Sequence, residues 1–201
     1  MAEIAKHRYG VIVSFMGPFS WPGISDAPSI FDAEEGRQSG IYLWTVPLRE
    51  GHLIYYVGET GRNFRTRLLE HYMEHAAAMY HVYSPAEFAR GEKVALWPGH
   101  FDTAHRKSAK ECVLNYSQFC KQIGELTYIL RFLLAPLACE ERIRRRVEAA
   151  IAKALSDTPG IVGTFQDRDI RYAARKDNEE PIECVITSTV PLLGLPERLS
   201  V

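Results

Sequence analysis

The sequence predicts an α+β fold in which helices flank a small, mainly antiparallel sheet. Three observations support this class: several short runs of strand type, two stretches with the 3.6-residue period of a helix, and a short loop between two neighbouring strand runs. The expected strands cover residues 9–15, 41–46, 53–57, 125–134 and, less distinctly, 94–97 and 182–189. We expect the 41–46 and 53–57 runs to form a hairpin that lies with the 125–134 strand at the centre of the sheet.

The expected hairpin brings two tyrosines together. With Val46 opposite His52 across the loop 47–51, Tyr42 lies opposite Tyr56. Directly opposed residues have Cβ atoms about 5 Å apart, so both phenols would stand on one face of the sheet and could act on one ligand.

The helix after the hairpin is expected to present a second pair of polar side chains. Asn63 can cap a helix over 64–79, since its side-chain oxygen can accept from the exposed amides of the first turn. Phe64, Leu68 and Tyr72 form its expected buried stripe, and Arg67 and His71, four residues apart, share a neighbouring stripe. Further helices are expected over 108–123, ended by Gly124, and over 140–155.

Composition places the chain among globular proteins. Its 201 residues are 46% hydrophobic and 24% charged, which is enough apolar material for a core and excludes a disordered chain. We expect a single domain over 1–201. No apolar run is long enough to span a bilayer and no signal-type segment opens the chain, so a cytoplasmic protein without a membrane partner is expected. The four cysteines have no CxxC spacing and are expected to be free thiols.

Basic residues gather in the middle of a chain whose net charge is −1. Residues 61–176 contain 19 Lys and Arg against 13 Asp and Glu, whereas both flanks are acidic. Such runs are typical of solvated helix faces, and they also suit contacts to a phosphate backbone. The candidates for such contacts are Arg62, Arg65, Lys107, Lys110, Arg144 and Arg145.

Five elements in order carry a family resemblance. Gly40-Ile41-Tyr42 is followed by Tyr56-Val57-Gly58, then by Arg67 and His71 on the next helix, then by Glu148 on a later amphipathic helix. This arrangement resembles the GIY-YIG nuclease superfamily. The resemblance covers residues 39–156 and leaves an N-terminal strand, an inserted segment at about 80–110 and a C-terminal extension outside it.

The resemblance implies a metal-dependent endonuclease that hydrolyses phosphodiester bonds of DNA with one Mg²⁺ or Mn²⁺ ion. It assigns Tyr42 as the base that takes a proton from water, with Tyr56 and His71 orienting water and phosphate. Arg67, a planar permanent cation, would stabilise charge on the phosphate in the transition state. Glu148 would bind the metal, because Mg²⁺ is commonly held by one or two carboxylates and the substrate's phosphate.

Other interpretations stay open at this stage. The tyrosines could be packed sheet residues, and Arg67 with His71 could be a solvated helix face. Glu140 and Glu141 are alternatives to Glu148 as metal ligands. No asparagine follows the expected metal-binding helix between residues 157 and 163, as family members often have, and that absence favours an inactive nucleic-acid-binding domain of the same fold. An interaction protein with a protein partner is a third possibility.

Overall fold

The computed structural model describes residues 10–201 apart from 25, 106 and 168–171. The strands are β1 (Gly10–Phe19), β2 (Gly40–Leu48), β3 (Gly51–Thr60), β4 (Val82–Tyr83), β5 (Ala95–Trp97), β6 (Arg131–Pro136), β7 (Glu183–Ser188) and β8 (Arg198–Ser200). The helices are α1 (Phe64–Ala76), α2 (Pro85–Phe88), α3 (Ala109–Ile129), α4 (Glu141–Asp157) and α5 (Ile161–Phe165), with a 3₁₀ turn, η1, at Glu34–Arg37.

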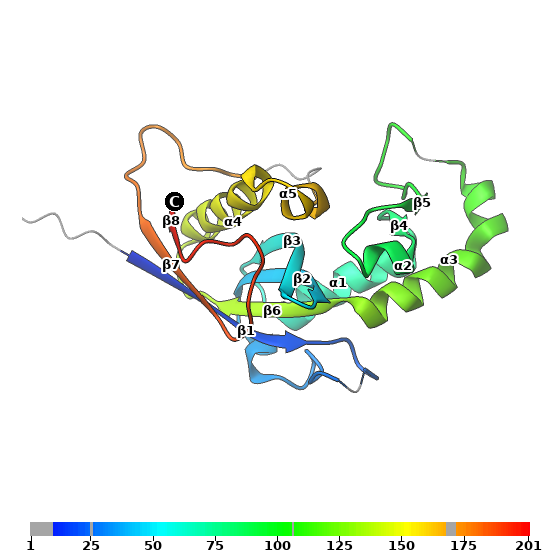
Figure 1. Ribbon diagram of the computed structural model, residues 1–201, viewed down its shortest axis with the longest axis horizontal. Helices are drawn as coiled ribbons and strands as arrows, with labels where there is room; N and C mark the ends of the chain where they lie inside the picture. The colour runs from blue at the N-terminus through cyan, green and yellow to red at the C-terminus, as the bar shows by residue number, and fades with distance from the viewer. Residues whose placement is uncertain (1–9, 25, 106, 168–171) are drawn as a thin grey trace, which may run out of the picture.

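Six of these strands form one sheet in the order β3-β2-β6-β1-β7-β8. Every neighbouring pair is antiparallel except β1 and β7, which are parallel. The predicted α+β class with a mainly antiparallel sheet is therefore confirmed. The hairpin β2–β3, however, lies at one edge of the sheet and not at its centre (Figure 1).

The hairpin differs from the predicted register. The strands are joined by the two residues 49 and 50, not by a five-residue loop, and Val46 pairs with Leu53. A bulge follows, because Trp44 pairs with Tyr56 while Thr45 pairs with Ile54. Tyr42 therefore lies opposite Gly58. The bulge adds one residue to β3, which local sequence patterns do not reveal. Tyr42 and Tyr56 still share a face, as predicted, with ring centroids 6.0 Å apart.

The strand predicted over 125–134 is wrong in its first half. Helix α3 continues through Gly124 to Ile129, and β6 begins at Arg131. The apolar residues of this region fit both periods: Phe119, Ile123 and Leu126 are buried at helical spacing, whereas Tyr128 is 63% exposed. Buried β6 then pairs with β2 on one side and β1 on the other.

The helix that follows the hairpin begins as predicted. Asn63 accepts a hydrogen bond from the Thr66 backbone N–H at 2.8 Å, which satisfies one exposed amide of α1. The helix ends at Ala76, three residues before the predicted end. Phe64 and Leu68 are fully buried, but Tyr72 is 39% exposed and does not complete the predicted stripe.

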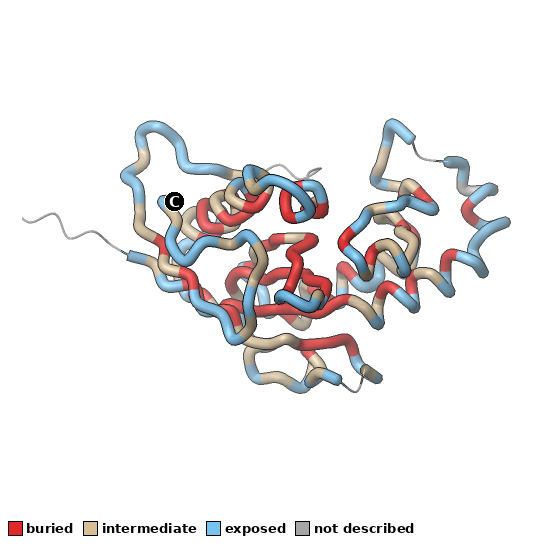
Figure 2. The backbone as a smooth tube through the Cα atoms, viewed as in Figure 1, coloured by how far each residue is buried: buried red, intermediate tan, exposed pale blue. Residues whose placement is uncertain are grey.

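The remaining helices cover and extend the sheet. Helix α4 packs on β3 and β2, and α5 packs on β3, so buried residues concentrate between these elements (Figure 2). Helix α3 runs away from the sheet beside β4, α2 and β5 (Figure 1). Among the described residues, no helix has the length and apolarity needed to cross a bilayer. All four cysteines lie in the described part of the chain and are unpaired, as predicted.

Candidate active site

A hydrogen-bonded cluster of rings lies between the hairpin and α1. The hydroxyl of Tyr42 and Nε2 of His71 are 2.8 Å apart. The Tyr56 ring stacks near Tyr42 at an interplanar angle of 28° and meets the His71 ring edge-on with centroids 5.6 Å apart. Strands β2 and β3 and helix α1 thus bring three of the predicted site residues into contact.

Glycines make this contact possible. A methyl group at Gly58 would overlap the Tyr42 ring, which crosses β3 at that point. Gly40 has φ of +153°, and a side chain there would collide with the backbone of Ala135 in β6. Both glycines therefore set the position of β2 and of the phenol that it carries.

Arg67 lies one turn before His71 on α1, with its side chain 29% exposed. Its Nη1 donates to Glu70 Oε2 at 3.1 Å, and Glu70 also accepts two hydrogen bonds from Arg62, at 2.5 and 2.7 Å. Arg67, His71 and Tyr56 line a groove of about 620 Å³ that continues along residues 101–105. One planar cation therefore faces a space that could admit a phosphate.

Two residues that sequence reasoning missed extend the cluster. Nδ1 of His71 lies 2.9 Å from the hydroxyl of Tyr80, and that hydroxyl donates to Glu74 Oε2 at 2.5 Å. Glu74 is three residues beyond His71 on α1, so helical spacing could have indicated it. Tyr80 follows the helix in a segment with no readable pattern.

Glu148 approaches the cluster from α4. Its Oε1 accepts from the backbone N–H of Glu59, at the end of β3, at 2.9 Å. Burial, and next the negative charge of Glu59, raise the pKa of the Glu148 carboxyl to about 7, while Arg145 and Arg67 act in the opposite direction. The charge of Glu148 in turn contributes to raising the pKa of Tyr56, after burial. The distant carboxylate is thus an electrostatic neighbour of Tyr56 and Arg67.

Electrostatics in the cluster favour neutral rings. Burial, followed by neighbouring Tyr56, raises the pKa of Tyr42 well above its usual value, although Arg67 opposes the shift. Burial, followed by the charge of Arg67, lowers the pKa of His71 to about 3. Tyr42 therefore holds its proton at neutral pH, and His71 keeps one nitrogen free to accept a hydrogen bond.

The donor set around Glu148 suits a hard divalent cation that shares its ligands with substrate. Within the described residues, no group of three His, Cys, Asp or Glu side chains could hold a metal ion by itself. Mg²⁺ usually keeps several waters and needs few protein carboxylates, so the single buried carboxylate of Glu148, once deprotonated, could hold it together with oxygens of a substrate phosphate. The alternatives Glu140 and Glu141 lie at the start of α4, where Glu141 pairs with Arg145 at 2.6 Å.

The predicted phosphate contacts divide into two groups. Arg144 is buried, with its guanidinium paired to Glu59 at 3.2 Å and donating to the Cys139 carbonyl, and Arg65 donates to the Ala33 carbonyl. Both support the protein's own backbone, so we remove them from the predicted nucleic-acid surface. Lys107 and Lys110 are exposed. The side chain of Arg62 is 58% exposed and that of Arg145 is 50% exposed, although each of these arginines pairs with a glutamate.

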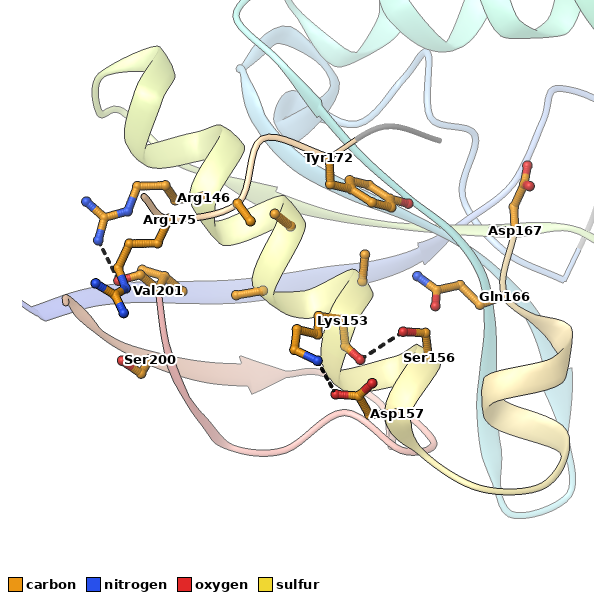
Figure 3. Close-up of a pocket in the computed structure, with 14 residues that line it drawn as sticks. Arg146, Lys153, Ser156, Asp157, Gln166, Asp167, Tyr172, Arg175, Ser200 and Val201 are labelled. Carbon is orange, nitrogen blue, oxygen red and sulfur yellow. Dashed lines mark hydrogen bonds and ion pairs between the residues drawn. The ribbon is translucent and has the colours of Figure 1, made fainter. Parts of the chain in front are cut away.

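A larger cavity, of about 750 Å³, lies against α4 and the C-terminal segment. Gln166 and the next residue, Asp167, both line it, and their side chains point in different directions (Figure 3). Asp167 also lines the groove that holds Arg67. The charge of Asp167 contributes to raising the pKa of Tyr56, after burial and Glu148, so this residue is a further electrostatic neighbour of the site that the sequence patterns did not single out.

The comparisons with known proteins are negative. No protein-family model, no curated protein and no solved structure matches this chain. The site is therefore interpreted from its own geometry and chemistry.

Proposed function

We propose that this chain is a divalent-metal-dependent endonuclease of GIY-YIG type that hydrolyses phosphodiester bonds of DNA. The observation that carries the proposal is the convergence of Tyr42, Tyr56, Arg67 and His71 in one cluster, with Glu148 beside it from a helix more than seventy residues away. Packing of aromatic rings by itself would not require the hydrogen bond between Tyr42 and buried His71, or a carboxylate, Glu148, near Arg67.

Each side chain has a role that its surroundings support. Arg67 faces the groove and can hold two phosphate oxygens at once, which stabilises the charge that grows on them during attack. Glu148 would hold the divalent ion, which supplies further charge neutralisation at the phosphate when bound. Tyr42 would accept a proton from the attacking water as its own hydroxyl proton moves to His71, since burial prevents it from standing as a free phenolate.

Access to Tyr42 places a condition on this mechanism. Tyr42 is 1% exposed and does not line the groove, whereas the Tyr56 ring above it does. We therefore infer that Tyr56 shifts when substrate binds and lets a water molecule reach the Tyr42 hydroxyl. Tyr56 would then orient that water.

The test is incubation of purified full-length protein with plasmid, nicked, branched and single-stranded DNA, in Mg²⁺, in Mn²⁺ and with chelator. We expect metal-dependent cutting that falls at least about a hundredfold in Arg67→Ala and in Glu148→Ala, the scale for removing one preorganised charge. Arg90→Ala is the matched control, because Arg90 pairs with Glu87 away from the cluster. If Arg67→Ala and Glu148→Ala both cut DNA as fast as the wild type, the assignment of these residues to an active site would be refuted.

A further inference from the structure

Resting on the proposed function, we infer that Tyr80 and Glu74 are positioning residues that fix the tautomer of His71, so that its Nε2 receives the hydroxyl proton of Tyr42. The four side chains form one continuous hydrogen-bonded line. It runs from Tyr42 on β2, through His71 and Tyr80, to Glu74 on α1, with heavy-atom distances of 2.8, 2.9 and 2.5 Å.

The donor and acceptor roles along this line are fixed by Glu74, at the end opposite Tyr42. A carboxylate has no proton to give, so the hydroxyl of Tyr80 donates to Glu74. Tyr80 has a single hydroxyl proton, and its oxygen therefore meets His71 Nδ1 as an acceptor. Nδ1 must carry the ring proton of neutral His71, which leaves Nε2 as the acceptor that faces Tyr42.

The same direction prepares Tyr42 for its role. With its O–H directed at His71 Nε2, the Tyr42 oxygen keeps two lone pairs. One is taken by a hydrogen bond from Arg67, and the other, beside Tyr56, can accept a proton from water once Tyr56 shifts. During attack, a water O–H bond breaks as a new Tyr42 O–H bond forms, and the original Tyr42 proton moves to Nε2. The remaining hydroxide bonds to phosphorus as the bond between phosphorus and the leaving sugar oxygen breaks, and that oxygen takes a proton from solvent. The imidazolium that results is balanced by the Glu74 carboxylate, whose Oε2 lies 3.5 Å from Nδ1.

The opposite tautomer would block this step. If Nε2 carried the proton, it would donate to the Tyr42 oxygen and occupy a lone pair that water needs. A histidine with two neutral phenols as neighbours has no fixed preference, since a hydroxyl can donate or accept. The carboxylate of Glu74 removes that freedom at Tyr80, and through Tyr80 at His71.

The first test measures the tautomer directly and does not depend on activity. In ¹⁵N-histidine-labelled protein, with the His71 signals assigned by their loss in His71→Gln, we expect the wild type to show the Nδ1–H form. Tyr80→Phe, which keeps the ring packed against His75 and Phe101, should lose that form. Glu74→Ala should lose it too, because Tyr80 can then donate to Nδ1, whereas Glu74→Gln keeps an acceptor and should retain it. An Nε2–H wild type, or an unchanged signal in Tyr80→Phe, would overturn the inference.

The second test is kinetic. We expect kcat for DNA cutting to fall about ten- to a hundredfold in Tyr80→Phe with KM changed by less than about twofold, because the loss is one of proton transfer and not of DNA binding. Tyr128→Phe, at an exposed tyrosine on α3, is the control and should match wild type. Thermal unfolding of each variant checks the fold. If the wild type cuts and Tyr80→Phe cuts equally well, the inference fails and the proposed function stands. If the wild type cuts no DNA, the proposed function fails, and the catalytic part of the inference fails with it.

Discussion

Because Gly58 has no side chain, the Tyr42 ring can lie against the backbone of β3. Replacement by alanine would push a methyl group into the Tyr42 ring, which is fully buried and has Phe64 on another side. Overpacking of this kind costs about 1–3 kcal/mol, and here the ring would have to leave His71 to relieve it. We therefore predict that Gly58→Ala lowers the free energy of unfolding by that amount and DNA cutting by at least about tenfold, as measured by urea unfolding and plasmid cleavage.

Gly124 provides a matched control for that substitution. It lies inside α3 with open space where a methyl group would stand. Alanine is favoured over glycine by roughly 0.5–1 kcal/mol inside a helix, so Gly124→Ala should stabilise the protein slightly and leave cutting unchanged. Equal behaviour of the two variants would contradict the role given to Gly58.

The buried histidine of the cluster makes stability depend on pH. Native His71 stays neutral down to pH about 3, whereas a histidine in the unfolded chain takes up a proton near pH 6.5. Below pH 6.5 the unfolded state therefore binds a proton that the native state does not. The contribution of His71 to stability is fully present above pH 6.5 and is lost as pH falls towards 3. Arg67 and His75 act with burial in this direction, while Glu70 opposes them.

We predict that the free energy of unfolding depends more strongly on pH in the wild type than in His71→Gln. Between pH 6.5 and pH 5, the wild type should lose about 2 kcal/mol of unfolding free energy more than His71→Gln, from the factor of 1.36 kcal/mol per pH unit. Urea unfolding at pH 5.0 and 7.5 measures this difference, and His105→Gln controls for the loss of an exposed histidine. If the free energies of unfolding of the wild type and His71→Gln differed by the same amount at both pH values, His71 would not be held neutral.

At the scale of elements, local signals in the sequence predicted what depends on local structure. The cap at Asn63, the start of α1, the hairpin and most of α4 follow from short patterns, and they place Arg67, His71 and Glu148 on the correct elements. The bulge in β3 escaped prediction because it depends on how two strands meet. The boundary between α3 and β6 was misplaced because alternating apolar residues there suit a helix as well as a strand.

The hydrogen-bonded line to Glu74 is likewise a feature of the site that local sequence patterns did not predict. Glu74 shares a helix with His71, so its spacing was available, but its significance depends on Tyr80. Tyr80 reaches the cluster from the segment between α1 and β4, whose path is set by tertiary packing against His75 and Phe101. Residues that act through another residue, and come from irregular segments, leave no periodic signal.

At the scale of the whole molecule, the segments before residue 39 and after residue 156 add strands to the same six-stranded sheet, whereas the inserted segment at about 80–110 forms a separate two-stranded sheet of β4 and β5. Strand β1 pairs with β6 on one side and with β7 on the other, although β7 lies more than 160 residues later in the chain. Val13, Phe15 and Cys184 are buried where these strands meet. A pairing over such a separation is decided by the assembled core, and no local pattern could have predicted it.

The distribution of charge over the whole molecule gives a final prediction, for binding. The net charge of −1 opposes general attraction to DNA, so the DNA binding that the proposed function requires would have to come from a local group of exposed cations near the groove that holds Arg67. Lys107 and Lys110 come two and five residues after the groove-lining residues 101–105 and are exposed.

We predict that the cutting-deficient Glu148→Gln protein binds DNA with an affinity that falls steeply as salt rises, because each phosphate contact releases counterions. Lys107→Ala and Lys110→Ala should each reduce the slope of log affinity against log salt by about 1. Lys121→Ala, at an exposed lysine further along α3 that pairs with Glu125, should leave the slope unchanged. Fluorescence anisotropy between 50 and 200 mM salt, about the range over which such contacts are resolved, measures all three. An affinity that does not respond to salt would instead favour a protein partner, since phosphate contacts cannot be independent of ionic strength.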